Sequence, residues 1–189
     1  MISRGIGNLK KALPRILEDA GCDLTPFSRE LFFDLRRQLL SLDEQVKEYD
    51  QRILAVFNAS PVCQMLAEVP GVGLLTATAV VAAVGNAHSF KNGRQMAAWL
   101  GLVPRQHSSG QKTRLLGISK RGDRYLRRLL VHGARSVIIR SDSKTDPRSR
   151  WLNAVKERRG ANKATVALAN KNARAMWAIL RNQTEFGLV

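Results

Sequence analysis

The longest regular pattern in this 189-residue chain is a run of apolar residues whose spacings alternate between three and four. Apolar residues at this spacing lie along one side of an α-helix, while polar and charged residues fill the positions between them. The pattern therefore predicts a long helix whose apolar seam, roughly four heptads in length, packs against another helix. The seam consists of Phe32, Leu35, Leu39, Leu42, Val46, Tyr49, Ile53 and Val56.

Two partners for this seam are compatible with the sequence. One is a second copy of the chain, which would give a coiled-coil homodimer through residues 32–56. The other is a shorter helix within the same chain, which Pro14 interrupts near its start and which is indicated by Leu9, Leu13, Ile16 and Leu17. The spacing alone fits both arrangements equally well.

Positive charge is concentrated in the second half of the chain. Residues 1–90 carry nine Lys and Arg against ten Asp and Glu, whereas residues 91–189 carry 22 basic against five acidic residues. A compact surface with this excess attracts phosphate groups by releasing condensed counterions. We therefore expect the C-terminal half to bind nucleic acid, with DNA as the partner. An acidic protein or an anionic membrane is the alternative use of such charge.

A turn rich in Pro and Gly follows the seam. Pro70 ends one apolar segment, and Gly71 and Gly73 precede another with helical spacing. Such glycines permit a tight turn, and the free amides at the start of the next helix can hold a phosphate. Residues 66–84 therefore predict a helix-hairpin-helix-like motif that contacts DNA, although an ordinary structural turn has the same pattern.

The segment 105–120 is rich in Ser, Gly and basic residues and has no sustained helical or strand period. It predicts an exposed basic Ser-Gly loop, with a short hairpin as the alternative. The helix expected next, over residues 123–140, carries arginines along one side and apolar residues along the other. The residues predicted to contact DNA are Gly71, Gly73, Arg105, Lys112, Arg114, Lys120, Arg121, Arg124, Arg128 and Arg135.

Two further helices are expected, over residues 149–159 and 162–182, in which Trp151 and Trp177 fall in the apolar phase. The fold class is therefore mainly all-α. A helical linker or coiled-coil region, residues 1–60, is followed by a small helical domain, residues 61–189. Cys22 and Cys63 match neither a disulfide framework nor a zinc pattern, and no apolar stretch is long enough to span a bilayer. We therefore expect a cytoplasmic protein without a membrane partner.

Three ordered segments resemble one known family. They are LAEVPGVGLLTATAVVAAVGN from Leu66, FKNGRQMAAWLGLVPRQHSSGQ from Phe90 and ISKRGDRYLRRLLVHGAR from Ile118. Together they resemble the C-terminal transposase domain of the insertion-sequence family one-hundred-and-ten, which also includes pilin-gene invertases. The most specific parts are residues 101–104, Ser109 with Gly110, and residues 119–122. The resemblance extends more loosely over most of the chain, and it implies a prokaryotic, nucleoid-associated protein.

The resemblance implies a two-part recombinase. An N-terminal RuvC-like domain supplies four acidic (DEDD) ligands for a divalent metal such as Mg²⁺, and a coiled coil dimerises the protein. The C-terminal domain supplies a serine that attacks a DNA phosphodiester, so the implied activity is DNA transposition through a covalent phosphoserine. A guide RNA from the element directs the reaction in relatives. Carried onto this chain, the nucleophile is Ser109, and Ser108 is the neighbour that competes for the assignment.

One part of the family pattern is missing from this sequence. Between residues 91 and 140 the only acidic residue is Asp123, so no carboxylate set for a two-metal site is apparent. We therefore expect no metal ligands here, no RuvC-like domain, and no autonomous recombination unless that domain acts in trans. The alternatives are a non-catalytic helix-hairpin-helix module that binds nucleic acid, and a regulatory fragment that pairs with a complete transposase through residues 32–56.

Overall fold

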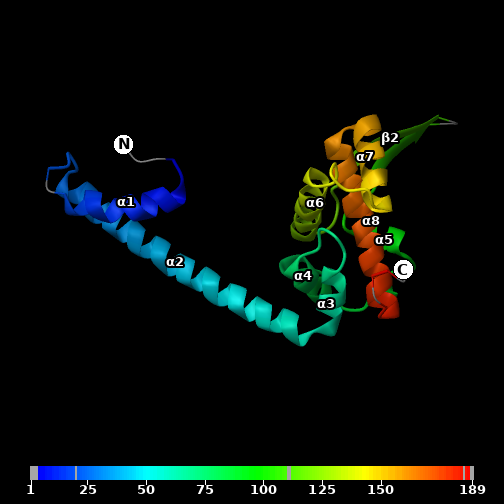
Figure 1. Cartoon of the computed structure of the whole chain (residues 1–189), viewed down its shortest axis with the longest axis horizontal. Helices are drawn as coiled ribbons and strands as arrows, with labels where there is room; N and C mark the ends of the chain where they lie inside the picture. The colour runs from blue at the N-terminus through cyan, green and yellow to red at the C-terminus, as the bar shows by residue number, and fades with distance from the viewer. Residues whose placement is uncertain (1–3, 20, 110–111, 185, 188–189) are drawn as a thin grey trace. The chain divides into compact units, whose positions relative to one another are not determined.

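The computed structural model describes residues 4–19, 21–109, 112–184 and 186–187. These residues form eight α-helices, one short 3-10 helix and a two-stranded sheet, which confirms the mainly all-α prediction (Figure 1). The chain divides into two compact units, Met1–Arg52 and Ile53–Val189. The long helix α2 (Pro26–Ala59) contains the point of division.

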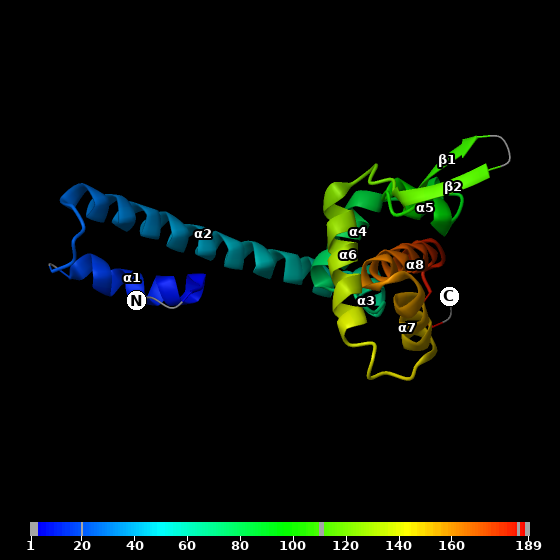
Figure 2. The same cartoon turned by 90° about the horizontal axis from the view of Figure 1, so that it is seen from above.

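In the first unit, α1 (Ile6–Glu18) runs antiparallel to the first half of α2 (Figure 2). The Arg29 guanidinium of α2 donates to the carbonyl of Leu17, which lies in the last turn of α1, and Lys10 pairs with Asp43. Unsatisfied carbonyls at a helix C-terminus favour such a cation. The shorter helix considered from the sequence therefore lies along α2, but neither of these contacts involves a residue of the seam. The expected interruption at Pro14 is wrong, because α1 continues through this residue.

The seam of α2 is largely uncovered in the monomer. No described residue of α2 is fully buried, and six of the eight seam residues are exposed, among them Leu42 with 57% and Tyr49 with 60% of its surface accessible. A helix of 13 residues is about 20 Å long, whereas one of 34 residues is about 51 Å. The length of α1 therefore allows it to cover less than half of α2.

In the second unit, α8 (Ala161–Asn182) is the central helix. It contacts α3 (Pro61–Ala67), the 3-10 helix η1 (Ala87–Ser89), α5 (Gly93–Trp99), α6 (Arg124–Ile139) and α7 (Pro147–Arg159). Most of its inner residues are small, including Ala164, Ala169 and Ala173. Small side chains allow neighbouring helices to approach closely, while Leu168, Met176 and Ile179 fill the core between them.

Local sequence explains where these helices begin. Asp123 accepts a hydrogen bond from the Leu126 amide at 2.8 Å and caps α6, and Asp146 caps α7 by accepting from the Ser149 amide at 3.0 Å. The Ser149 hydrogen bonds hold the pKa of the Asp146 carboxyl below its usual value. The predicted helices over 123–140, 149–159 and 162–182 are thus present, with starts within two residues of those expected.

The Pro-Gly turn joins α3 to α4 (Leu74–Val84) and is held from two sides. Gly71 has a φ of +89°, and a Cβ placed on it would lie 2.7 Å from the Gly133 carbonyl oxygen of α6. A Cβ on Gly133 would in turn overlap the Gly71 carbonyl oxygen. From the other side, the Asn172 side-chain amide of α8 donates to the Pro70 carbonyl at 2.8 Å. The turn is therefore fixed against both α6 and α8.

We predict that Gly133→Ala destabilises the second unit by about 1–3 kcal/mol, the range typical of overpacking, because the backbone of Gly71 cannot move away freely. Urea unfolding measures this change. The matched control is Gly73→Ala in the same turn, where an added Cβ meets nothing within 4 Å. The control should change stability by less than about 1 kcal/mol, the scale of helix-cap effects. Equal losses in the two variants would contradict the assigned contact.

Candidate nucleic-acid interface

The basic segment expected as a loop forms an antiparallel hairpin of β1 (Pro104–Ser109) and β2 (Lys112–Ile118). The expectation of an irregular loop is therefore wrong, and the short hairpin considered beside it is present. Most described side chains of the hairpin are exposed, so neither strand has the alternating apolar face that identifies a strand in sequence. The hairpin extends outward from the helices of the second unit (Figure 2).

Ser109 lies at the end of β1, opposite Lys112 in the strand register. It is exposed. His107 pairs with Arg114 two positions away, so the period of two places Ser109, His107 and Arg114 on the same face of the hairpin. Gly110 and Gln111, and the side chains of Ser108 and Lys112, lie outside the described part of the structure.

The most specific motifs of the sequence anchor this hairpin to the helices. The Ser119 amide donates to the Val103 carbonyl at 2.8 Å, and the Lys120 amide donates to the Gly101 carbonyl at 3.1 Å. Gly122 contacts the Trp99 carbonyl so closely that a Cβ on Gly122 would overlap it. The segments 101–104 and 119–122, which are separate in the sequence, therefore lie side by side and are joined by backbone hydrogen bonds.

Arg127 of α6 also holds the base of the hairpin against the helices. Its guanidinium donates to the Leu100 carbonyl at 3.0 Å and to the Arg121 carbonyl at 3.3 Å. This arginine is half-buried and serves packing, unlike the predicted DNA contacts Arg124 and Arg128 beside it, which are exposed. Helical phase separates the two kinds of arginine, because Arg127 lies about 80° from the centre of the side that carries Arg124 and Arg128, toward the buried residues.

The predicted arginine stripe is present on α6. Arg124, Arg128 and Arg135 are exposed and fall within about 40° of one another around the helix, at 3.6 residues per turn. Arg121 precedes the helix and is also exposed. The opposite side of α6 carries buried Leu126, Leu130, Ala134 and Ile138.

Charge in the second unit is scarcely neutralised within the protein. In its described part the one ion pair is that of Lys156 with Asp142, at 2.7 Å. The exposed arginines of α6 and the basic residues Arg105, Arg114 and Lys120 of the hairpin region belong to no ion pair among the described residues. Their charge is therefore available to an anionic partner.

The two predicted contacts in the Pro-Gly turn lie in different surroundings. Gly71 is half-buried against α6, so the close backbone approach that it permits is made inside the protein. Gly73 is exposed, and it caps α4 without a side-chain hydrogen bond. Its contact with DNA stays a prediction, as does that of Gly71.

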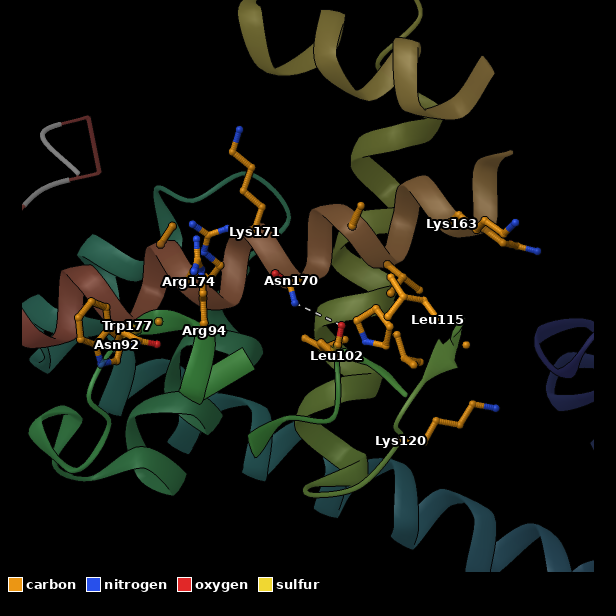
Figure 3. Close-up of a pocket in the computed structure, with 18 of the residues that line it drawn as sticks. Asn92, Arg94, Leu102, Leu115, Lys120, Lys163, Asn170, Lys171, Arg174 and Trp177 are labelled. Atoms are coloured by element: carbon orange, nitrogen blue, oxygen red, sulfur yellow. Dashed lines mark hydrogen bonds between the residues drawn. The ribbon is translucent and has the colours of Figure 1, made fainter. Parts of the chain in front are cut away.

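A groove that the sequence did not predict lies between the hairpin, α5 and α8 (Figure 3). Its volume is about 1520 Å³. Asn170 of α8 donates to the Leu102 carbonyl at 3.2 Å across its floor. Trp151 and Trp177 line it and pack, partly buried, against the core, as their apolar phase indicated. Its basic residues are Arg94, Lys120, Lys163, Lys171 and Arg174.

Segments far apart in sequence form this groove, which explains why sequence reasoning missed it. A weak signal was available on the last helix, where Lys163, Lys171 and Arg174 share a side with the small residue Ala167. Such a helix face can lie at the bottom of a groove without filling it. Arg94 gave no comparable signal.

Two classes of site are absent from the described residues. In this part of the chain, no group of three or more His, Cys, Asp and Glu side chains is placed to hold a metal ion. No helix within the same described ranges has the length and apolar character needed to cross a bilayer.

Comparison with known proteins finds similarity over the segments that form the hairpin and α6. Residues 63–150 match the model of the Transposase IS116/IS110/IS902 family. The matched segment, 88 of the chain's 189 residues, is therefore similar to this transposase family. It contains the Pro-Gly turn, the hairpin with Ser109, and the arginine stripe of α6.

The similarity to individual relatives extends beyond residues 63–150. The transposase of insertion sequence element IS1111A from Coxiella burnetii is 48% identical over 185 residues, which is 98% of this chain and 51% of the relative. A probable family 20 transposase from Pseudomonas aeruginosa is 50% identical, over 82% of this chain and 46% of its own length. The transposase of IS1328 from Yersinia enterocolitica is 35% identical, over 97% and 54%. This chain thus spans about half the length of these relatives.

Proposed function

We propose that this chain is the part of an insertion-sequence transposase that binds DNA and supplies the serine nucleophile for strand exchange. The observation that carries the proposal is the position of Ser109. It is exposed at the end of a basic hairpin, within a segment that matches the model of a transposase family.

The proposed reaction is a transesterification at a DNA phosphodiester. The Ser109 oxygen forms a bond to a DNA phosphorus, and the serine proton passes to a base or to water. One phosphodiester bond breaks, and the departing deoxyribose oxygen takes up a proton. The phosphoserine ester retains the phosphoryl linkage, so a hydroxyl of a second DNA strand can attack it and release the serine. Arg114, on the same face, would stabilise the charge that develops on the phosphoryl oxygens.

The metal ions implied by the family resemblance have no place in this scheme. The described residues contain no cluster of acidic, His or Cys side chains that fits a metal. We assign metal-dependent activation to a RuvC-like domain outside this chain, and we assign target choice to the guide RNA that the resemblance implies. No step here depends on either.

Duplex binding is proposed for the exposed cations of α6 and the hairpin. Arginines along one helix face can follow a phosphate backbone, since each neutralised phosphate releases counterions. The free amides at the Gly73 cap of α4 would add a phosphate contact of the kind that helix N-termini make. These contacts position a duplex without reading its sequence.

We predict that the combined variant Arg124→Ala, Arg128→Ala and Arg135→Ala flattens the salt dependence of duplex binding. The slope of log affinity against log salt should fall by about 3, because each phosphate that is no longer neutralised lowers it by about 0.9. Fluorescence anisotropy at several salt concentrations measures the slope. The matched control removes the same charge from exposed positions of α7, as Arg150→Ala, Arg158→Ala and Arg159→Ala. Equal slopes for the two variants would mean that net charge alone determines binding.

The nucleophile is tested in a chimera, because this chain spans only about half the length of its relatives. The chain replaces the matching half of the Coxiella burnetii transposase, and the chimera is incubated with nicked target DNA. We expect a covalent protein–DNA adduct that Ser109→Ala abolishes and the adjacent Ser108→Ala retains. An adduct that persists in Ser109→Ala would eliminate this serine.

The same experiment separates the proposal from its main rival. A chimera that binds the target DNA but forms no adduct, even with Ser109 present, would indicate a non-catalytic nucleic-acid-binding module. A mobility-shift measurement on the same samples establishes whether DNA is bound.

We further propose that the uncovered seam of α2 dimerises the protein. Leu42, Val46, Tyr49 and Val56 are each more than half exposed, and a pair of such seams would bury them in knobs-into-holes packing. The seam also supports a second candidate function, in which this chain pairs with a complete transposase and inhibits it. Co-purification of the chain with a complete transposase tests that possibility.

We predict that Val46→Lys converts a dimer to a monomer, because it places a charge in the buried seam of the coiled coil. Sedimentation equilibrium measures the change. Gln45→Lys is the matched control, since it adds the same charge at an exposed position outside the seam. A wild-type monomer at micromolar concentration, or equal effects of the two lysines, would contradict the seam as the dimer interface.

A further inference from the structure

The groove between the hairpin, α5 and α8 differs in chemistry from the arginine stripe of α6. It shares only Lys120 with the residues assigned above to duplex binding. Its volume of about 1520 Å³ exceeds the roughly 300–1,000 Å³ of typical small-molecule sites. The size therefore favours part of a polymer as its occupant.

The charge of the groove lining indicates that the polymer is anionic. Five cations line the groove, all five are exposed, and its lining contains no carboxylate among the described residues. They come from three places along its length, with Arg94 on α5, Lys120 after β2, and the others on α8. From Lys163 to Arg174 the helix rises about 16 Å at 1.5 Å per residue. The distribution fits a polyanion that follows the groove.

The floor between these cations is mainly apolar, although the Asn170 side chain crosses it. Leu102, Ile118 and Val166 line it, and Leu115 of the hairpin is 63% exposed beside it (Figure 3). A nucleic-acid duplex presents phosphates and sugars on the outside, whereas an unpaired strand exposes the apolar faces of its bases. An apolar floor flanked by cations therefore complements an unpaired strand better than a duplex.

Two contacts hold the sides of the groove in place. The Lys171 ammonium lies 4.7 Å from the centre of the Trp151 ring, and the Trp177 indole donates to the Ala87 carbonyl at 3.3 Å. Both tryptophans are partly buried, so they act as walls rather than as free stacking platforms. A charge held in position over a fixed wall loses little entropy when it binds phosphate.

We propose that this groove binds an unpaired nucleic-acid strand, with phosphates on its cations and base faces on its apolar floor. DNA and RNA share this chemistry. The inference goes beyond the proposed function, because it depends neither on Ser109 nor on the stripe of α6.

The test compares labelled oligonucleotides of about 12 nucleotides, within the usual site size of single-strand binding proteins. Single-stranded DNA, single-stranded RNA and a DNA duplex of the same sequence are titrated with the full chain. Lys163→Ala with Arg174→Ala should lower affinity for the unpaired strands about tenfold, the scale expected when two phosphates are no longer neutralised, and change duplex affinity by less than about twofold. The control, Arg158→Ala with Arg159→Ala on α7, removes the same charge outside the groove.

An uncharged variant tests the floor separately. Leu115→Ser should weaken binding of unpaired strands about fivefold, in keeping with the worth of base contacts, without altering the salt slope. Ile139→Ser is its control, because Ile139 is 73% exposed on α6 and does not line the groove. All these positions are exposed, so thermal unfolding should be unchanged and a folding defect would be evident.

Three outcomes distinguish whether the groove binds an unpaired strand. Selective loss of affinity with both unpaired strands, or with one of them, supports the proposal and identifies whether DNA or RNA is preferred. Equal loss for duplex and unpaired strands would make the groove a general polyanion surface and overturn it. Unchanged affinity for unpaired strands would also overturn it, while the adduct formed by Ser109 would be unaffected.

Discussion

The backbone contact between Gly71 and Gly133 sets the distance between α6 and the turn that joins α3 to α4. Any side chain at either position would separate them, because each would meet a carbonyl oxygen of the other segment. The Asn172 amide then ties the same turn to α8 through Pro70. Three elements distant in sequence are thus fixed together, and the outer face of α6 is held in one orientation.

The contact of Gly122 with Trp99 extends this frame to the hairpin. Two strands with few buried side chains would be marginally stable alone. Here the hairpin base is held by backbone hydrogen bonds to residues 101–103 and by the guanidinium of Arg127. The base of the hairpin is therefore fixed to the helices, whereas Ser109 lies at the opposite end of β1.

Much of the fold could be predicted from periodicity. The seam of α2 and the apolar stripes of α6 and α8 each recur often enough to predict a helix, and Asp123 marks the start of α6 as a cap. The hairpin could not be predicted with the same certainty, since exposure of both its faces removes the alternation of apolar residues. The contacts of Arg127 could not be predicted, because its phase places it toward the apolar side of α6 but does not identify the carbonyls of Leu100 and Arg121 as its partners. The candidate site was predictable only in part, for a related reason. The exposure of the α6 arginines follows from their phase, whereas the groove arises where Arg94, Lys120 and α8 meet, although Arg94 and Arg174 are 80 residues apart in the sequence.

The proposed strand exchange would require both the arginine stripe of α6 and the groove. A reaction that moves a strand from one duplex to another must hold paired DNA while a strand is unpaired. A stripe of arginines supplies charge alone and so suits a duplex, whose base faces are hidden. The groove adds apolar surface, which bases can cover only when they are unstacked. Its neighbouring cations also repel one another, a cost that an anionic ligand with apolar faces would relieve. A protein with both surfaces can therefore favour the unpaired state over the paired one at one position and bind the duplex at another, without reading sequence at either.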